Sequence, residues 1–227
     1  MSEVILGLYA EGSTDYDFLP SVIRRTTEQV LVQHDRNEMD ATVLVIQLTK
    51  GQEEERAESI FQAARNAYGY HALVVHSDAD DPRPDKAKVE RIEPGFKRVQ
   101  ETKEEVCKNL VPIIPVQAIE AWILADYQLL LAEIGTKMKA DELGIPTKAG
   151  QVESISKPKR RLEDTVRKAY ASRSKRQRKT DIDSLYEPMG EKIRLERLKE
   201  LSSYLQFVDD LTETLKELNI IPHTNRF

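Results

Sequence analysis

The chain has 227 residues, 40% of them hydrophobic, which suits one good-sized α/β domain and excludes a disordered protein. Its net charge of −5 argues against a general nucleic-acid-binding protein. The single cysteine, Cys107, excludes an intramolecular disulfide and, with four scattered histidines, leaves no recognisable zinc site. The sequence has neither an apolar run near the roughly 20 residues that cross a bilayer nor a secretory signal, so we expect a soluble protein of the cytoplasm without membrane contact.

The N-terminal part predicts strands that alternate with helices. Short, continuous and partly β-branched apolar runs predict strands at residues 4–10, 42–48 and 72–76. The first and third are apolar throughout, as in strands buried on both faces of a parallel sheet. A helix capped by Ser13 or Thr14 is expected after the first strand, and a polar helix at 52–68 after the second. This order predicts an α/β fold with a mainly parallel central sheet flanked by helices.

The rest of the chain is predicted to be mostly helical. The expected elements are a helix at 96–108, a strand at 111–116, an apolar helix at 117–134 and a leucine-rich helical region at 192–218. Pro112 and Pro115 cannot donate ladder hydrogen bonds, which places their strand at an edge or in an irregular position. We expect a catalytic core at 1–135, with the basic segment and C-terminal helices of 136–227 packed on it as a helical extension of one structural domain.

Two acidic patterns follow predicted strands. Glu11 comes directly after the first strand, and Asp78 and Asp80 follow the third. Ligands of open α/β sheets gather at the carboxyl ends of the strands, and clustered carboxylates there repel one another unless a proton or a cation holds them. Magnesium prefers oxygen ligands, so the first hypothesis is a Mg²⁺ site, with Mn²⁺ as a substitute. Asp15 either supports the metal or is simply an acid at a helix N-terminus.

Three further residues are candidates of unequal weight. Glu120 interrupts an apolar run in the first turn of a predicted helix, and a buried lone carboxylate is costly unless a cation or an arginine accompanies it. Asp126 lies six residues later, on another helix face, and is the weaker candidate. His76 could point into the site with Asp78, but a buried, hydrogen-bonded histidine is the favoured interpretation.

A basic segment contrasts with the acidic body of the chain. Residues 157–179 carry a net charge of +9, so the remainder carries −14. Such a run is usually a solvated face, but beside an acidic site it favours contact with a nucleic-acid backbone, by bidentate arginines and point-charge lysines. The candidate contact residues are Lys157, Lys159, Arg160, Arg161, Arg173, Lys175 and Arg176.

These motifs resemble those of the Toprim catalytic domain of topoisomerases, primases and OLD-family nucleases, which has a glutamate after the first strand and a D-x-D after a later one. Here they are Glu11-Gly12 and Asp78-Ala79-Asp80. The block Ile119-Glu120-Ala121-Trp122-Ile123-Leu124-Ala125-Asp126 is similar to the bacterial family DUF4276, usually classed as Toprim-like. The resemblance covers roughly the first 135 residues well. It implies a Mg²⁺-dependent phosphoryl-transfer centre at Glu11, Asp78 and Asp80, with Glu120 as a family-specific addition.

The leading functional hypothesis is a metal-dependent nuclease that cuts DNA or RNA. The resemblance also implies a role in anti-phage defence or a mobile element, beside a separate ATPase, because the chain has no G-x-x-x-x-G-K-[ST] loop of its own. The first alternative is a non-catalytic regulatory or nucleic-acid-binding subunit of such a complex. The second is a phosphatase acting on a small nucleotide. A homodimer is compatible with the sequence.

Overall fold

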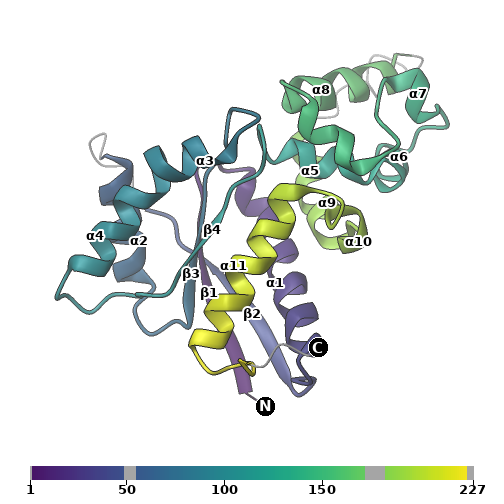
Figure 1. Ribbon diagram of the computed structural model, residues 1–227. Helices are drawn as coiled ribbons and strands as arrows, with labels where there is room; N and C mark the ends of the chain where they lie inside the picture. Colours follow the sequence, from purple (N-terminus) through teal and green to yellow (C-terminus); the bar gives the residue numbers. More distant parts are fainter. Residues whose placement is uncertain (1, 49–54, 172–181, 224–227) are drawn as a thin grey trace.

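The computed structural model describes residues 2–48, 55–171 and 182–223. At its centre lies a four-stranded, all-parallel sheet in the order β2-β1-β3-β4 (Figure 1). The strands are β1 (Ser2–Tyr9), β2 (Met39–Val45), β3 (Ala72–His76) and β4 (Leu110–Ile113). The predicted α/β fold with a parallel sheet is thus confirmed, as is the edge position of the proline-containing fourth strand.

Alternating side chains divide the strands between two hydrophobic layers. Leu6 and Leu8 of β1 point into one layer, and all five residues of β3 are buried, with Val74 on the same side and Leu73 and Val75 on the other. This is the pattern of strands covered on both faces.

Helices cover both faces of the sheet. On one face lie α2 (Arg56–Asn66) and α4 (Glu93–Glu101), and on the other α1 (Asp15–Gln33) and α11 (Ser202–Glu217) (Figure 1). Between β3 and α4 the chain forms α3 (Pro84–Ala87) and a π-helical turn, η1 (Lys88–Ile92). None of the helices in the described part of the chain has both the length and the apolarity to span a membrane.

The remaining helices form a lobe and a bridge back to the sheet. The lobe contains α5 (Glu120–Ala125), α6 (Tyr127–Ile134), α7 (Ala140–Leu143) and α8 (Pro158–Ala169), with the 3-10 helix η2 (Ala149–Ser154) between the last two. It projects beyond the strand ends (Figure 1). The bridge contains η3 (Ile182–Leu185), α9 (Tyr186–Lys192) and α10 (Leu195–Leu198). One hydrophobic core runs from Val4 to Ile221 and includes residues of the sheet, the lobe and α11.

Several predicted boundaries were wrong. The helix predicted at 96–108 ends at Glu101, and the helix predicted at 117–134 is two helices that meet at Asp126. The second strand begins three residues earlier than predicted and also ends three residues earlier. Thr14 does occupy the N-cap position of α1, but its side chain makes no capping bond. Asp15, the first residue of α1, instead accepts the N–H of Gly12 at 2.7 Å and so binds the segment that precedes the helix.

Candidate functional site

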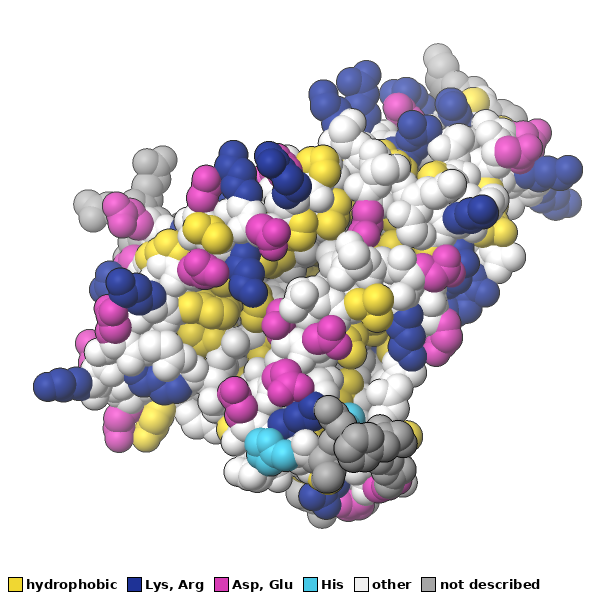
Figure 2. Space-filling model, viewed as in Figure 1, with side chains coloured by type: hydrophobic (Ala, Val, Ile, Leu, Met, Phe, Trp, Pro, Cys, Tyr) yellow, Lys and Arg dark blue, Asp and Glu magenta, His cyan; other side chains and the backbone are white. Residues whose placement is uncertain are grey.

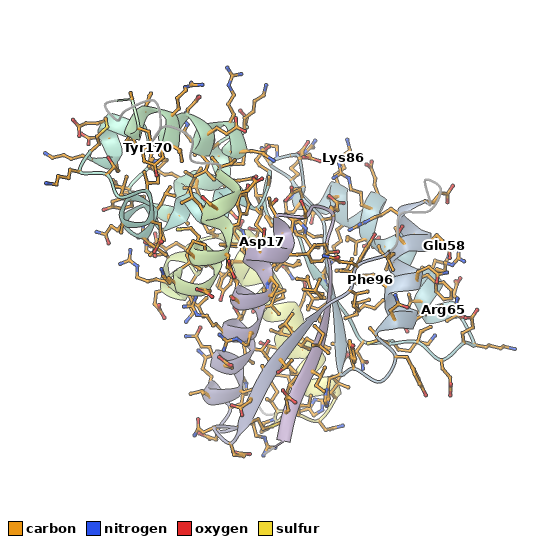
Figure 3. All side chains as sticks on the ribbon, turned by 180° about the vertical axis from the view of Figure 1, so that it is seen from behind. Asp17, Glu58, Arg65, Lys86, Phe96 and Tyr170 are labelled. Carbon is orange, nitrogen blue, oxygen red and sulfur yellow. The ribbon has the colours of Figure 1, made fainter. Side chains whose placement is uncertain are left out.

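The predicted acidic residues meet at one edge of the sheet. β1 and β3 are parallel neighbours, so the segments that follow them leave the sheet side by side. Glu11, Asp15, Asp78 and Asp80 line one cavity of about 650 Å³, together with Glu120 from the start of α5. The structure therefore brings all five predicted carboxyl residues to one cavity. Seen from behind, the start of α1, marked by Asp17, lies between the lobe and α3 (Figure 3).

The backbone under the cavity is held in an uncommon conformation. The segments that follow β3 and β4 stay paired beyond the strands. Ala79 donates its N–H to Pro115 O at 3.1 Å, and Asp80 donates its N–H to Gln117 O at 2.8 Å. Asp80 and Gln117 have φ values of 53° and 64°, in the left-handed region that non-glycine residues seldom adopt. Strained residues of this kind persist only where the surroundings fix them, and they cluster at functional sites.

Glu11 is held by two residues that the sequence did not point to. Ser77 Oγ donates to Glu11 Oε1 at 2.8 Å, and Arg56 Nη2 lies 3.6 Å from the same oxygen. Arg56 also donates to the carbonyl oxygen of His76 and stacks over the Tyr9 ring, 4.8 Å from its centroid. These contacts fix the carboxylate at the end of β1 and neutralise part of its charge.

His76 is buried between two carboxylates. Its Nδ1 lies 3.1 Å from Asp15 Oδ2 and its Nε2 lies 3.3 Å from Asp78 Oδ1, at ion-pair distance but without the alignment of good hydrogen bonds. Burial alone would lower the pKa of His76, but the charges of Asp15 and Asp78 raise it to about 10. The imidazole is therefore a cation at neutral pH, and its charge lowers the pKa of Asp15 despite burial. The favoured interpretation is thus confirmed in its burial but not in its hydrogen bonding, and His76 contacts Asp15 and Asp78 from beneath the cavity without lining it.

Asp78 and Asp80 face different partners. Asp78 Oδ1 accepts the backbone N–H of Ile119 at 3.1 Å, which ties the end of β3 to the start of α5. Asp80 Oδ2 accepts from Arg91 Nη1 at 2.9 Å, and the same nitrogen donates to the carbonyl oxygen of Asp78, also at 2.9 Å. The two aspartates thus belong to one loop but are neutralised by different cations, His76 and Arg91.

Glu120 is the most buried carboxylate that lines the cavity. Only 4% of its surface is exposed, and the predicted position in a first helical turn is confirmed. Within the described residues, the side chain that hydrogen-bonds to it is the Tyr186 hydroxyl, which donates to Oε1 at 2.5 Å, rather than the expected cation or arginine. Burial raises the pKa of Glu120, although the bond from Tyr186 opposes the shift. Tyr186 lies on α9, so the bridge helices contribute directly to the site.

The segment at the start of α8 forms a mainly basic wall of the cavity, which also contains Glu163. Lys157, Lys159 and Arg160 line it at the N-terminus of α8, and Lys159 is close enough to Asp15 and Glu120 to act electrostatically on both carboxyls. Arg161 is not part of this wall and instead donates to Gly144 O at 2.8 Å. Lysine and arginine side chains gather along the outer edge of the lobe (Figure 2). The other predicted basic contacts, Arg173, Lys175 and Arg176, lie outside the described residues.

The donor set at the cavity suits a hard cation such as Mg²⁺. The five predicted acidic side chains and Glu163, which also lines the cavity, all offer carboxylate oxygens, and the cavity has room for water, which Mg²⁺ retains when bound. In the described ranges no three His, Cys, Asp or Glu side chains form a ready-made metal-holding group. Glu11 and Asp80 each have one carboxylate oxygen beside an arginine, so a bound ion would share these carboxylates with a second cation or displace it.

Asp126 has a structural environment. Its side chain is fully buried, accepts the Leu129 N–H at the start of α6, and accepts the backbone N–H and two guanidinium N–H groups of Arg194. Although burial would raise its pKa, these hydrogen bonds lower it. Asp126 does not line the cavity and instead ties α6 to the bridge helices.

Sequence reasoning missed Arg56, Ser77, Arg91 and Tyr186. Ser77 was within reach, because it stands between β3 and Asp78. The others approach from elements remote in sequence, and no local pattern distinguishes them from surface arginines or core tyrosines.

The sequence matches the family model DUF4276, a domain of unknown function, over residues 10–211. Comparison with curated proteins gave no match, and comparison with solved structures gave none either. The matched span includes every acidic residue of the cavity and its basic wall, and it covers most of the chain. This protein therefore belongs to the DUF4276 family.

Proposed function

We propose that the chain is a Toprim-like, Mg²⁺-dependent nuclease that hydrolyses phosphodiester bonds of DNA or RNA. The observation that carries the proposal is the cavity with two walls of opposite charge, in which carboxylates at the ends of β1 and β3 face Lys157, Lys159 and Arg160. A phosphodiester needs both walls, because cations must hold the phosphate backbone while acidic residues serve the metal and the proton transfers. A role in anti-phage defence with a separate ATPase is part of the same proposal.

Each residue has a defined task. Asp78, Asp80 and Glu11 are the residues that would hold Mg²⁺, with Asp15 and Glu120 beside them. When bound, the ion supplies an activated water and neutralises charge on the phosphate. Lys157 and Lys159 hold the strand by point charges, and Arg160 can bind a phosphate with two parallel hydrogen bonds. Ser77 and Arg56 keep Glu11 oriented toward the cavity.

The test is cleavage of single-stranded and double-stranded DNA and RNA by the purified chain, with Mg²⁺, Mn²⁺ or a chelator. Asp78→Asn keeps the size of the side chain but removes its charge, and should lower turnover at least about 100-fold, the scale of a lost catalytic group. Asp164→Asn is the matched control, because Asp164 lies on α8 in a local pair with Arg167. Equal activity of wild type and Asp78→Asn would mean that this cavity does not cut nucleic acid.

The pairing of the acidic residues with internal cations favours one second candidate. Arginines beside Glu11 and Asp80, and an imidazolium beside Asp78, suit a non-catalytic, nucleic-acid-binding subunit whose acidic residues are structural. This candidate predicts salt-sensitive binding without turnover, because neutralised phosphates release counterions. Cleavage of free nucleotides but not of polynucleotides would instead indicate a phosphatase.

A further inference from the structure

Arg91 lies outside the acidic motifs but contacts one of them, the loop after β3. Its Nη1 bridges two acceptors in the loop after β3, the Asp80 carboxylate and the Asp78 carbonyl oxygen, each at 2.9 Å. The Arg91 side chain is 37% exposed and that of Asp80 is 64% exposed, so the pair lies at the surface, within reach of an ion from solvent. A single side chain thus neutralises Asp80 and restrains the backbone that carries both aspartates.

The elements at both ends of this contact are unusual. Arg91 belongs to η1 (Lys88–Ile92), a π-helical turn between α3 and α4, and such turns are rare and are frequently found at functional sites. Asp80 has a left-handed φ of 53°. Two uncommon backbone conformations, eleven residues apart, therefore converge on one ion pair.

A neighbouring ion pair shows what an ordinary contact in this loop looks like. Arg83 Nε lies 3.4 Å from Asp81 Oδ1, and its side chain is 80% exposed. That contact joins residues two positions apart and belongs to a local turn. Exposed pairs of this type contribute little. Arg91 differs because it reaches the loop from a separate element and also binds its main chain.

We propose that Arg91 is a built-in counter-cation of the metal site, which holds Asp80 in the metal-free protein and must release it when a divalent cation binds. The inference rests on the proposed function in one respect, that Asp80 is a metal ligand. An arginine and a divalent ion on one carboxylate repel each other, so the two cations compete. Arg91 thereby keeps the unloaded carboxylates from repelling one another and sets the concentration of ion at which the site fills.

The test is Mg²⁺ and Mn²⁺ binding, measured by titration calorimetry on the full chain without nucleic acid. Arg91→Met removes the charge while keeping much of the length, and should tighten binding about tenfold, which corresponds to about 1.4 kcal/mol. Arg91→Lys keeps the charge and should stay near wild type. Arg83→Met is the matched control, because it removes the same charge from a second arginine that pairs with an aspartate of this loop, and it should change the affinity less than about twofold.

Thermal unfolding supplies a second measurement that does not depend on turnover. Without metal, Arg91→Met should melt below wild type, because Asp80 loses its partner, and Mg²⁺ should raise its melting temperature more than that of wild type. Equal or weaker metal affinity in Arg91→Met, or an effect no larger than that of Arg83→Met, overturns the inference.

Failure of this inference can be told apart from failure of the proposed function. If Asp78→Asn abolishes ion binding while Arg91→Met leaves the affinity unchanged, the metal site stands and the role of Arg91 does not. If Arg91→Met tightens binding but no polynucleotide is cut, the role of Arg91 stands and the nuclease does not. If neither wild type nor Arg91→Met binds a divalent ion, both are wrong.

Discussion

Replacing Asp126 by alanine should destabilise the protein strongly without touching the cavity. The carboxylate accepts four N–H groups, at 3.3 Å from Leu129 N and at 3.1, 2.8 and 2.5 Å from three nitrogens of Arg194. Loss of the helix cap costs about 1 kcal/mol. An unpaired backbone N–H and lost charge-assisted bonds add about 2 kcal/mol, discounted because the Arg194 side chain is half exposed. The total of about 3 kcal/mol predicts a melting temperature lower by roughly 6–12 °C.

Urea unfolding followed by circular dichroism measures this cost. Asp164→Ala, which breaks a surface pair within α8, should stay within about 0.5 kcal/mol of wild type. Acid provides a second criterion. Hydrogen bonds from Arg194 lower the pKa of Asp126 in the folded protein. Ionised Asp126 therefore stabilises the fold fully at pH values above its pKa in the unfolded chain, and this stabilisation is lost as the pH falls through its pKa in the folded protein. The difference between wild type and Asp126→Asn should therefore shrink below about pH 4. A cost of Asp126→Ala equal to that of Asp164→Ala would refute the structural role.

Three further outcomes are expected. The pKa of His76 is raised to about 10 in the folded protein. Protonated His76 should therefore stabilise the fold fully below about pH 6.5, and this stabilisation should be lost as the pH rises toward 10. In metal-free buffer, the difference in stability between wild type and His76→Gln should shrink over that range. A constant difference would contradict a charged imidazole. Gly190→Ala should cost about 1–3 kcal/mol in urea unfolding, because the added Cβ would lie 2.9 Å from Phe18 Cα, and an unchanged midpoint would show that α1 and α9 can separate freely. Lys159→Ala should reduce the salt dependence of nucleic-acid binding by about one counterion, whereas an unaltered slope would remove this lysine from the interface.

The sheet was predictable from sequence because its signal is local. The first four of the five buried residues of β3 are apolar and two of them are β-branched, and the prediction for residues 72–76 matches the strand at both ends. The ends of the helices were harder to predict than the strands. The break between α5 and α6 lies at Asp126, which caps α6 through the Leu129 N–H and also binds Arg194 from 68 residues away, and the apolar pattern of residues 117–134 outweighed this single polar residue in the prediction.

The sequence predicted the carboxylates of the cavity but not the residues that contact them. Carboxylates at strand ends meet because parallel neighbouring strands end together, and this follows from strand order alone. Their partners come from other elements. Arg56, Arg91 and Tyr186 reach the site through tertiary packing, and nothing in their local sequence distinguishes them. The partner expected for Glu120 was a cation or an arginine, but in the packed core a phenol hydroxyl serves.

The hydrogen bond between Glu120 and Tyr186 can form only late in synthesis of the protein. During synthesis the strands and α5 leave the ribosome well before α9. For an interval, the nascent chain therefore contains Glu120 but not Tyr186, whose hydroxyl group donates a hydrogen bond to it in the folded protein. The same interval leaves the α1 face of the sheet without α11. The acidic cavity is thus finished only when the bridge helices have been translated, and a prematurely terminated product would carry the carboxylates without their native setting.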